Sequence, residues 1–333
     1  MTFEQQAGGF RKTFLSLADE IGKIIVGQRG TVEGVLTCLF AGGNCLIEGV
    51  PGLGKTLLVK TLSEAVDLKF SRIQFTPDLM PADIIGTEII HVDEHGAKSL
   101  RFRPGPVFAQ VILADEINRA TPKTQSALLE AMQEHRVTVG GTTHALEEPF
   151  LVIATENPLE MEGTYLLPEA QLDRFFLKLD VPFSTREELN SILERTTGTG
   201  ESSVSRILDG PRLLEARKVV RQVVAAPEVK DYCSRIVLAT HPEVAGSPET
   251  ARRFLRWGAS PRGAQALLLA GKVHALLAER FNVSFHDIQR VVLPCLRHRI
   301  ALNFEAQAEG LKEDAILTKI LEVVPTAERA MVG

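Results

Sequence analysis

The chain has 333 residues, of which 44% are hydrophobic and 24% charged, as in most globular proteins. Its formal net charge of -5 argues against nucleic acid as the main partner. The start of the chain lacks the basic and apolar regions of a signal peptide, no apolar run reaches the ~18 residues of a membrane span, and the four cysteines form no paired motif, so we expect a cytoplasmic protein.

Up to residue 183, short apolar runs alternate with stretches of helical period, which predicts β/α units around a parallel sheet. The five predicted strands lie at residues 44–49, 70–75, 109–116, 149–158 and 175–183. Two segments, residues 86–106 and 135–149, interrupt this order of strands and helices. In each of them, residues of different character alternate on both sides of a turn. We expect both to be β-hairpins inserted into the α/β core.

The character of the sequence changes after Pro182. Five stretches between Ser184 and Ile300 have helical period and no strand-like run separates them. We therefore expect an α/β core over residues 1–183 and a separate, all-helical domain over residues 184–333.

The segment GVPGLGKT, from Gly49 to Thr56, fits the pattern G-x-x-x-x-G-K-[ST] of a phosphate-binding loop. It lies directly after a predicted strand and before a helical stretch, the context in which glycines let backbone N–H groups surround phosphates at a helix N-terminus. Lys55 would bridge the β and γ phosphates of a nucleotide, and Thr56 would hold Mg2+. The alternative is a glycine turn that binds no ligand.

The third predicted strand ends in the pair Asp115-Glu116. Phosphoryl transfer needs a metal holder and a group that orients or deprotonates water, and a carboxylate pair at the carboxyl end of a buried strand supplies both. We assign the metal to Asp115 and the attacking water to Glu116. The fourth predicted strand ends in Asn157, whose amide could position the same water; alternatively it begins the loop before Pro158.

Two arginines lie where folding does not require them. Ser260 and Pro261 are predicted to cap and open a helix, which puts Arg262 in its first turn, where a cation is unfavourable by roughly 0.3 to 1 kcal/mol. A bound phosphate would reverse that cost. The stretch LPEAQLDRF opens a short helix at Pro168 and runs into the fifth strand, so we expect Arg174 near the carboxyl ends of the strands. For either arginine, the alternative is a charge exposed to solvent.

Seven blocks in this order resemble the AAA+ ATPases, and within them the MoxR family, over nearly the whole chain: GVPGLGKT (49–56), FTPDLMPADIIG (75–86), FRPGPVFAQVILADEINRA (102–120), ATENP (154–158), LPEAQLDRF (167–175), GASPR (258–262) and LRHRI (296–300). The resemblance implies Walker A at Lys55 and Thr56, Walker B at Asp115 and Glu116, sensor 1 at Asn157, an arginine finger at Arg174 and sensor 2 at Arg262. It also puts Val26-Gly27-Gln28 near the adenine. The nucleotide contacts implied are Val26, Gly27, Gly49, Pro51, Gly52, Leu53, Gly54, Lys55, Thr56, Leu57 and Asp115.

The resemblance further implies an AAA+ P-loop core with a helical lid, and a ring, commonly hexameric, with ATP and Mg2+ between neighbouring subunits. Members of the family are similar to chaperones that remodel or mature protein complexes, often with a von Willebrand factor A domain partner. The two hairpins fall where related proteins carry inserts that face the surface or pore of the ring.

Two other functions stay open. A helicase or loader ring would need basic, aromatic-rich hairpins, but the first hairpin balances its cations with acids and the second is not basic. The other is a regulatory switch that binds ATP and rarely cleaves it, because turnover depends on the geometry of the ring.

Overall fold

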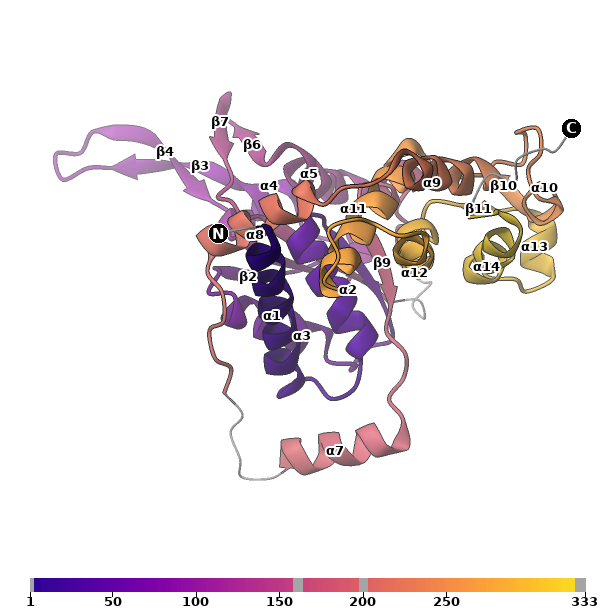
Figure 1. Cartoon of the computed structure of the whole chain (residues 1–333). Coiled ribbons are helices and arrows are strands. Elements are labelled where there is room, and N and C mark those ends of the chain that lie inside the picture. The colour runs from indigo at the N-terminus through magenta and orange to yellow at the C-terminus, as the bar shows by residue number, and fades with distance from the viewer. Residues whose placement is uncertain (1–2, 158–163, 198–202, 327–333) are drawn as a thin grey trace, which may run out of the picture.

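A parallel five-stranded sheet forms the centre of the molecule in a computed structural model that describes residues 3–157, 164–197 and 203–326 (Figure 1). The strand order is β2-β5-β8-β1-β9, and every pairing between neighbours is parallel. The five strands are β1 (Cys45–Glu48), β2 (Phe70–Gln74), β5 (Val111–Asp115), β8 (Leu151–Glu156) and β9 (Leu177–Asp180). Each of the five predicted strands is confirmed within its predicted range; Pro158, at the end of one range, lies outside the described residues.

Alternate residues of the central strands face two separate cores, as the period of two in a strand requires. Leu113 and Ile153 belong to the core shared with α1, α2 and α3, whereas Ile112 and Val152 belong to the core shared with α4 and α5. Helices therefore cover both faces of the sheet, which is why the three inner strands β5, β8 and β1 are apolar along most of their length, whereas the edge strands β2 and β9 also carry polar residues. The helices of this part are α1 (Phe3–Gly22), α2 (Arg29–Ala41), α3 (Lys55–Ala65), α4 (Pro81–Ile85), α5 (Pro122–Glu134) and α6 (Glu169–Leu172), with 3-10 turns at Pro106–Phe108 and Ile117–Arg119.

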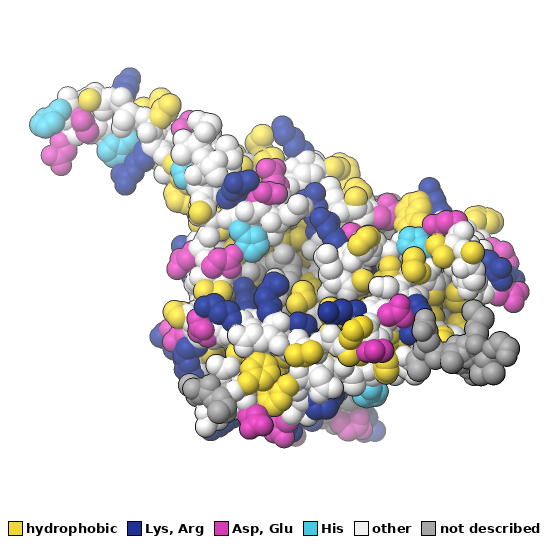
Figure 2. Space-filling model, turned by 45° about the horizontal axis from the view of Figure 1, so that its top comes forward, with side chains coloured by type: hydrophobic (Ala, Val, Ile, Leu, Met, Phe, Trp, Pro, Cys, Tyr) yellow, Lys and Arg dark blue, Asp and Glu magenta, His cyan; other side chains and the backbone are white. Residues whose placement is uncertain are grey.

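Both predicted hairpins are present. The first pairs β3 (Gly86–Val92) with β4 (Lys98–Pro104), and the second pairs β6 (Arg136–Val139) with β7 (Thr142–Ala145) across Gly140-Gly141. The first hairpin projects far from the body of the protein (Figure 1). Figure 2 shows hydrophobic side chains and charges of both signs mingled along it.

The C-terminal region is helical, as expected, with one addition: a short antiparallel pair of strands, β10 (Leu255–Trp257) and β11 (Ala301–Leu302), lies among its helices. Its helices are α7 (Arg186–Thr197), α8 (Gly210–Gln222), α9 (Pro227–Ala239), α10 (Glu249–Phe254), α11 (Pro261–Leu277), α12 (Phe285–Leu296), α13 (Phe304–Ala308) and α14 (Glu313–Val323). Among the described residues, no helix combines the length and the apolar character needed to cross a membrane.

The segment that leads into α8 returns to the α/β part before the remaining helices form. Ile207 N donates to Ala65 O at the end of α3 (2.8 Å), and Arg217 Nε donates to Leu39 O of α2 (2.9 Å). α8 also contacts α11. These contacts join the two parts on either side of residue 183, and the domain boundary at that residue stays a prediction.

Candidate functional site

The loop Gly49–Thr56 joins the end of β1 to the start of α3, as the phosphate-loop pattern predicts. Gly52 and Gly54 have φ values of 85° and 75°, in the left-handed region that residues other than glycine seldom adopt. Gly54 caps α3, and within the described part of the chain no side-chain cap accepts a hydrogen bond from the first turn of this helix. These helix-terminal N–H groups and the field of the helix suit an anion.

Lys55 lies over this loop and close to the acids of the site. Its Nζ donates to Gly49 O and to Val50 O (3.4 Å). Burial lowers the pKa of Lys55, whereas the nearby carboxylates of Asp115 and Glu116 act in the opposite direction. The loop cation and the two predicted catalytic acids therefore share one electrostatic environment.

Asp115 ends the buried strand β5, and its two carboxylate oxygens have different partners. Thr155 Oγ1 donates to Asp115 Oδ1 (2.7 Å), and Arg72 donates to Asp115 Oδ2 through Nε (3.0 Å) and Nη2 (2.7 Å). These bonds fix the orientation of the carboxylate. Together with the hydroxyl of Thr56 at the start of α3, it offers the oxygen donors that Mg2+ prefers, so the residues present fit this ion.

Glu116 has a backbone conformation that is rare outside glycine, with φ 56° and ψ 52°. Its N–H donates to Thr155 Oγ1 (2.8 Å), so one threonine hydroxyl contacts both acids. Glu116 Oε2 accepts hydrogen bonds from Gln74 Nε2 and from Arg119 Nη1, both at 3.0 Å. The carboxylate is thus held by Gln74 at the end of β2 and by Arg119 just beyond β5.

Asn157 is buried directly after β8, which lies between β5 and β1 in the sheet. Its neighbour Glu156 shares this edge with Glu48 of β1 and Lys178 of β9, which form an ion pair. Burial raises the pKa of Glu156 to about 7, the charge of Glu48 adds to this shift and the charge of Lys178 opposes it. Lys55, Asp115, Glu116 and Asn157 therefore all come from the carboxyl edge of the sheet.

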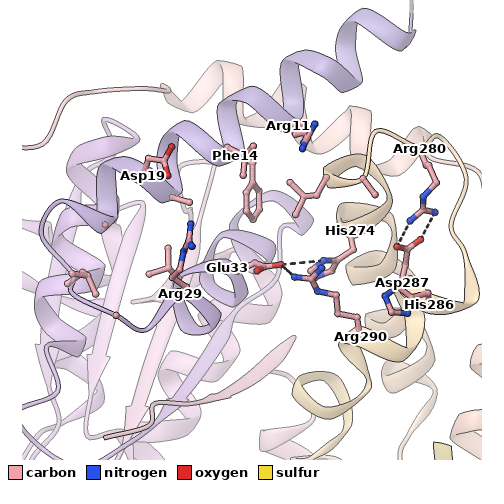
Figure 3. A pocket seen from close by; sticks show the side chains of 18 residues that line it. Arg11, Phe14, Asp19, Arg29, Glu33, His274, Arg280, His286, Asp287 and Arg290 are labelled. Carbon is pink, nitrogen blue, oxygen red and sulfur yellow. Dashed lines mark hydrogen bonds and ion pairs between the residues drawn. The ribbon is translucent and has the colours of Figure 1, made fainter. Parts of the chain in front are cut away.

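The segment Val26-Gly27-Gln28 is tied to the phosphate loop, because Gln28 Nε2 donates to Leu53 O (2.9 Å). Gly27 lines a pocket of about 710 Å³ between α1, α2, α11 and α12, whose polar and charged walls include Arg29, Glu33, His274 and Arg290 (Figure 3). A Cβ on Gly27 would lie 2.0 Å from Glu188 Oε1 of α7, so this helix packs directly against the segment. Leu57 is 47% exposed on α3 beside the loop, and Pro51 is exposed within it.

Arg174 lies at the amino ends of the strands, and the expectation that it lies near their carboxyl ends is wrong. It lies three residues before β9 begins at Leu177. Between the two, Phe176 donates its N–H to Asn44 O, directly before β1 (2.8 Å). A residue that precedes a parallel strand lies at the opposite edge from the loops that follow such strands. The four residues of β9 span roughly 13 Å, and Arg174 Nη1 donates to Leu129 O of α5 (3.1 Å). Arg174 is therefore far from the phosphate loop of its own chain.

Arg262 lies in the first turn of α11, as predicted, and Ser260 caps that helix by accepting a hydrogen bond from Arg262 N (3.1 Å). The anion at this helix end is a carboxylate of the same chain: Arg262 Nη1 lies 3.7 Å from Asp173 Oδ2. Because Asp173 precedes Arg174, the two arginines lie on the same edge of the sheet. The chain therefore brings together the loop, the acids and Asn157, and holds the two arginines apart from them.

The sequence interpretation overlooked several side chains that orient this machinery. Thr155 contacts both acids, and its signal is a polar residue inside an otherwise apolar predicted strand. Arg72 holds Asp115, and it had no such signal because its own strand also contains Ser71 and Gln74. Gln74 and Arg119 were not overlooked: their places at the end of the second predicted strand and just after the third mark them as residues that could couple the nucleotide to neighbouring subunits or serve a structural role, and both donate to Glu116. Asp173 had no signal of its own, because its partners come from a region more than eighty residues away in the sequence.

Comparisons with known proteins match this arrangement. Residues 44–177 match the family described as ATPase family associated with various cellular activities (AAA), and residues 249–320 match the AAA lid domain. Chaperone MoxR1 of Mycobacterium tuberculosis is 42% identical over 92% of this chain and 80% of its own length. YeaC of Bacillus subtilis, an uncharacterised protein, is 42% identical over 92% of both chains.

Protein MoxR of Methylorubrum extorquens is 29% identical over 92% of this chain and 93% of its own. Among solved structures, that of a proposed ATPase from Cytophaga hutchinsonii superimposes with a TM-score of 0.89 at 40% identity, and covers 97% of both chains.

Proposed function

Because this chain belongs to the MoxR family of AAA+ ATPases, we propose that it binds MgATP at the Gly49–Thr56 loop and hydrolyses it to ADP and phosphate. The amides of the loop and of the first turn of α3 bind the phosphates, and Lys55 contacts the β and γ phosphates. Thr56 and Asp115 hold Mg2+, which when bound neutralises charge on the phosphates during transfer. Val26 and Gly27, with Leu53 and Leu57 nearby, contact the nucleoside; the Gln28 bond to the loop supports this assignment.

Glu116 acts on the water that attacks the γ phosphate. Its carboxylate accepts a proton or orients the water, and Asn157 positions the same water from the neighbouring strand end. The observation that carries the proposal is the arrangement of Glu116: it follows the metal-holding Asp115 on β5, and Thr155 contacts both residues. A site that only bound nucleotide would have no need of this second, oriented acid.

The arginines reach ATP bound to a neighbouring subunit. Both Arg174 and Arg262 lie on the amino edge of the sheet, away from the phosphate loop of their own chain, and Arg174 lines an outward pocket of about 280 Å³ beside α5. In a closed ring, this edge of one subunit faces the carboxyl edge of the next. A permanently charged guanidinium then meets the charge that develops on the γ phosphate. We propose a hexameric ring.

The ring acts as a chaperone-like remodeller or maturation factor for partner protein complexes. The name of the 42% identical relative, chaperone MoxR1, supports this role. A protein client or a von Willebrand factor A domain partner is proposed on the family resemblance. The cytoplasmic location rests on the four cysteines, which are all buried free thiols and fit a reducing compartment.

Replacing Glu116 with Gln tests the proposal. Glu116→Gln should still bind MgATP and should lose turnover by about 100- to 10,000-fold, because the acid for the water is gone. Turnover is measured as phosphate release and binding with a fluorescent ATP analogue. Glu64→Gln, on the exposed side of α3, is the matched control and should behave like the natural protein. Unchanged turnover in Glu116→Gln would refute the assignment of this residue.

A further inference from the structure

Asp173 is the shared acceptor for three side chains of the C-terminal region. Ser260 Oγ lies 2.8 Å from each carboxylate oxygen, Arg299 Nε donates to Oδ1 (2.9 Å), and Arg262 Nη1 lies 3.7 Å from Oδ2. Asp173 is thus joined to the cap of α11, to the first turn of that helix and to the end of α12. Its carboxylate is only 17% exposed.

Arg299 fixes the backbone around Arg174. Its side chain is 3% exposed, and its guanidinium donates to the carbonyl oxygens of Asp173 (3.3 Å), Phe175 (2.5 Å) and Phe176 (3.2 Å). His298 Nε2 lies 3.0 Å from Phe175 O as well. Burial lowers the pKa of Arg299, and the charge of Asp173 is among the interactions that oppose this shift.

These contacts hold the backbone before and after Arg174. The Arg174 guanidinium itself takes no part in them and donates to Leu129 O of α5. The residue before Arg174 and the two residues after it are held by one buried arginine. The same carboxylate that Arg299 holds also contacts Arg262 and its helix cap. The pair of Asp173 and Arg299 therefore links the position of Arg174 to that of Arg262.

We propose that Asp173 and Arg299 are positioning residues for ATP hydrolysis: they hold Arg174 and Arg262 as one rigid unit aimed at the nucleotide of the neighbouring subunit. Neither residue touches the nucleotide. The inference rests on the proposed function, since it gives the pair a role only if the two arginines serve a neighbour's ATP. Rates of phosphoryl transfer are sensitive to small errors in such positions, so a loosened pair should slow turnover without weakening ATP binding.

The alternative role for the pair is simply to join the C-terminal region to the sheet. An experiment on mixed subunits separates the two roles. Asp173→Asn keeps the size of the side chain and one oxygen for Arg299, and removes the charge that faces Arg262 and Ser260. Arg299→Lys, the second variant, keeps the charge and loses the planar fork that spans several carbonyls. Asp231→Asn, an acid on α9 paired with Arg235, is the matched control and should leave turnover unchanged.

Each variant alone should show a kcat about 10- to 100-fold below that of the natural protein, with a KM for ATP within about twofold. Mixing either variant with Lys55→Ala subunits should restore turnover above that of both parents, because Lys55→Ala subunits carry an intact arginine edge and the variants carry an intact phosphate loop. Circular dichroism and the midpoint of thermal unfolding check that each variant is folded.

Three results would overturn the inference: natural turnover in both variants, a loss expressed mainly as a higher KM for ATP, or no recovery on mixing. The mixture of Arg174→Ala with Lys55→Ala separates this failure from failure of the proposed function. If that mixture recovers activity and the Asp173→Asn and Arg299→Lys mixtures do not, the positioning role is wrong. If the Arg174→Ala mixture does not recover either, or the natural protein releases no phosphate, the proposed shared site itself is wrong.

Discussion

Thr155 connects the two acids of the candidate site through one hydroxyl group. It donates to Asp115 Oδ1 and accepts from Glu116 N, at 2.7 Å and 2.8 Å. The hydroxyl is fully buried, so water cannot replace these bonds when they are lost. The orientation of the metal holder and the backbone of the proposed base therefore depend on the same atom.

Thr155→Val removes this hydroxyl at almost constant volume. We expect kcat for ATP to fall about 10- to 100-fold, because both acids lose their orientation while the phosphate loop is untouched. The dissociation constant for ATP should change little. Thr37→Val is the matched control, since Thr37 is equally buried and its hydroxyl donates only to Glu33 O of its own helix. Steady-state turnover and equilibrium ATP binding check the prediction, and equal kcat values in the two variants would contradict it.

At this scale the sequence predicted the residues that belong to a local pattern. Lys55, Thr56, Asp115, Glu116 and Asn157 each follow a recognisable strand or loop, and the strand ends bring most of them to one edge. Arg72 and Asp173 could not be found this way, because their partners are set by strand order and by the packing of α11 and α12. Such contacts depend on tertiary structure, which no local motif contains.

The carboxyl ends of β1, β8 and β9 form a charged element beneath the phosphate loop. Glu48, Glu156 and Asp180 lie in register across these three strands, and Lys178 pairs with Glu48. Among the described residues, no hydrogen bond from another side chain offsets the cost of burying the Glu156 carboxylate. Burial raises its pKa to about 7. The folded protein therefore binds a proton at this carboxyl group more tightly than the unfolded chain does.

The sign of the resulting pH dependence follows from the two pKa values. The pKa of Glu156 is about 7 in the folded chain against 4.5 for the ordinary group, so its contribution is most favourable below pH 4.5 and is lost as the pH rises through 7. Glu156→Gln should raise the free energy of unfolding by roughly 1 to 3 kcal/mol at pH 8 and change it little at pH 5. Thermal unfolding at both pH values measures this, with Glu64→Gln as an exposed control. A gain at pH 5 that equals the gain at pH 8 would contradict the explanation.

The sequence predicted the elements well where their pattern is local. The five strands and the two hairpins follow from apolar runs and turn residues, and the cap at Ser260 was found with its helix. The return of α8 to the core was not predicted, because a helix of this length can pack on either part of the chain. The contacts of Ile207 and Arg217 with α3 and α2 decide where it lies.

At the scale of the whole molecule, one chain carries the two parts of the proposed site on opposite edges of its sheet. The loop and acids lie on the carboxyl edge, and Arg174 and Arg262 lie on the amino edge with Asp173. The sequence identified both parts, but the expected place of Arg174 was wrong: a residue that precedes a parallel strand lies at the amino edge of the sheet. The position of Arg174 on the edge opposite to its own phosphate loop supports the proposed site shared between subunits.

The most direct test of the shared site is ATP turnover in mixtures of two inactive variants. Lys55→Ala has no working phosphate loop, and Arg174→Ala lacks the guanidinium for its neighbour. We predict that Arg174→Ala binds ATP almost normally, that each variant alone releases phosphate at least about 100-fold more slowly than the natural protein, and that the mixture recovers activity above both. A mixture no more active than its components would contradict a site completed by the neighbouring subunit.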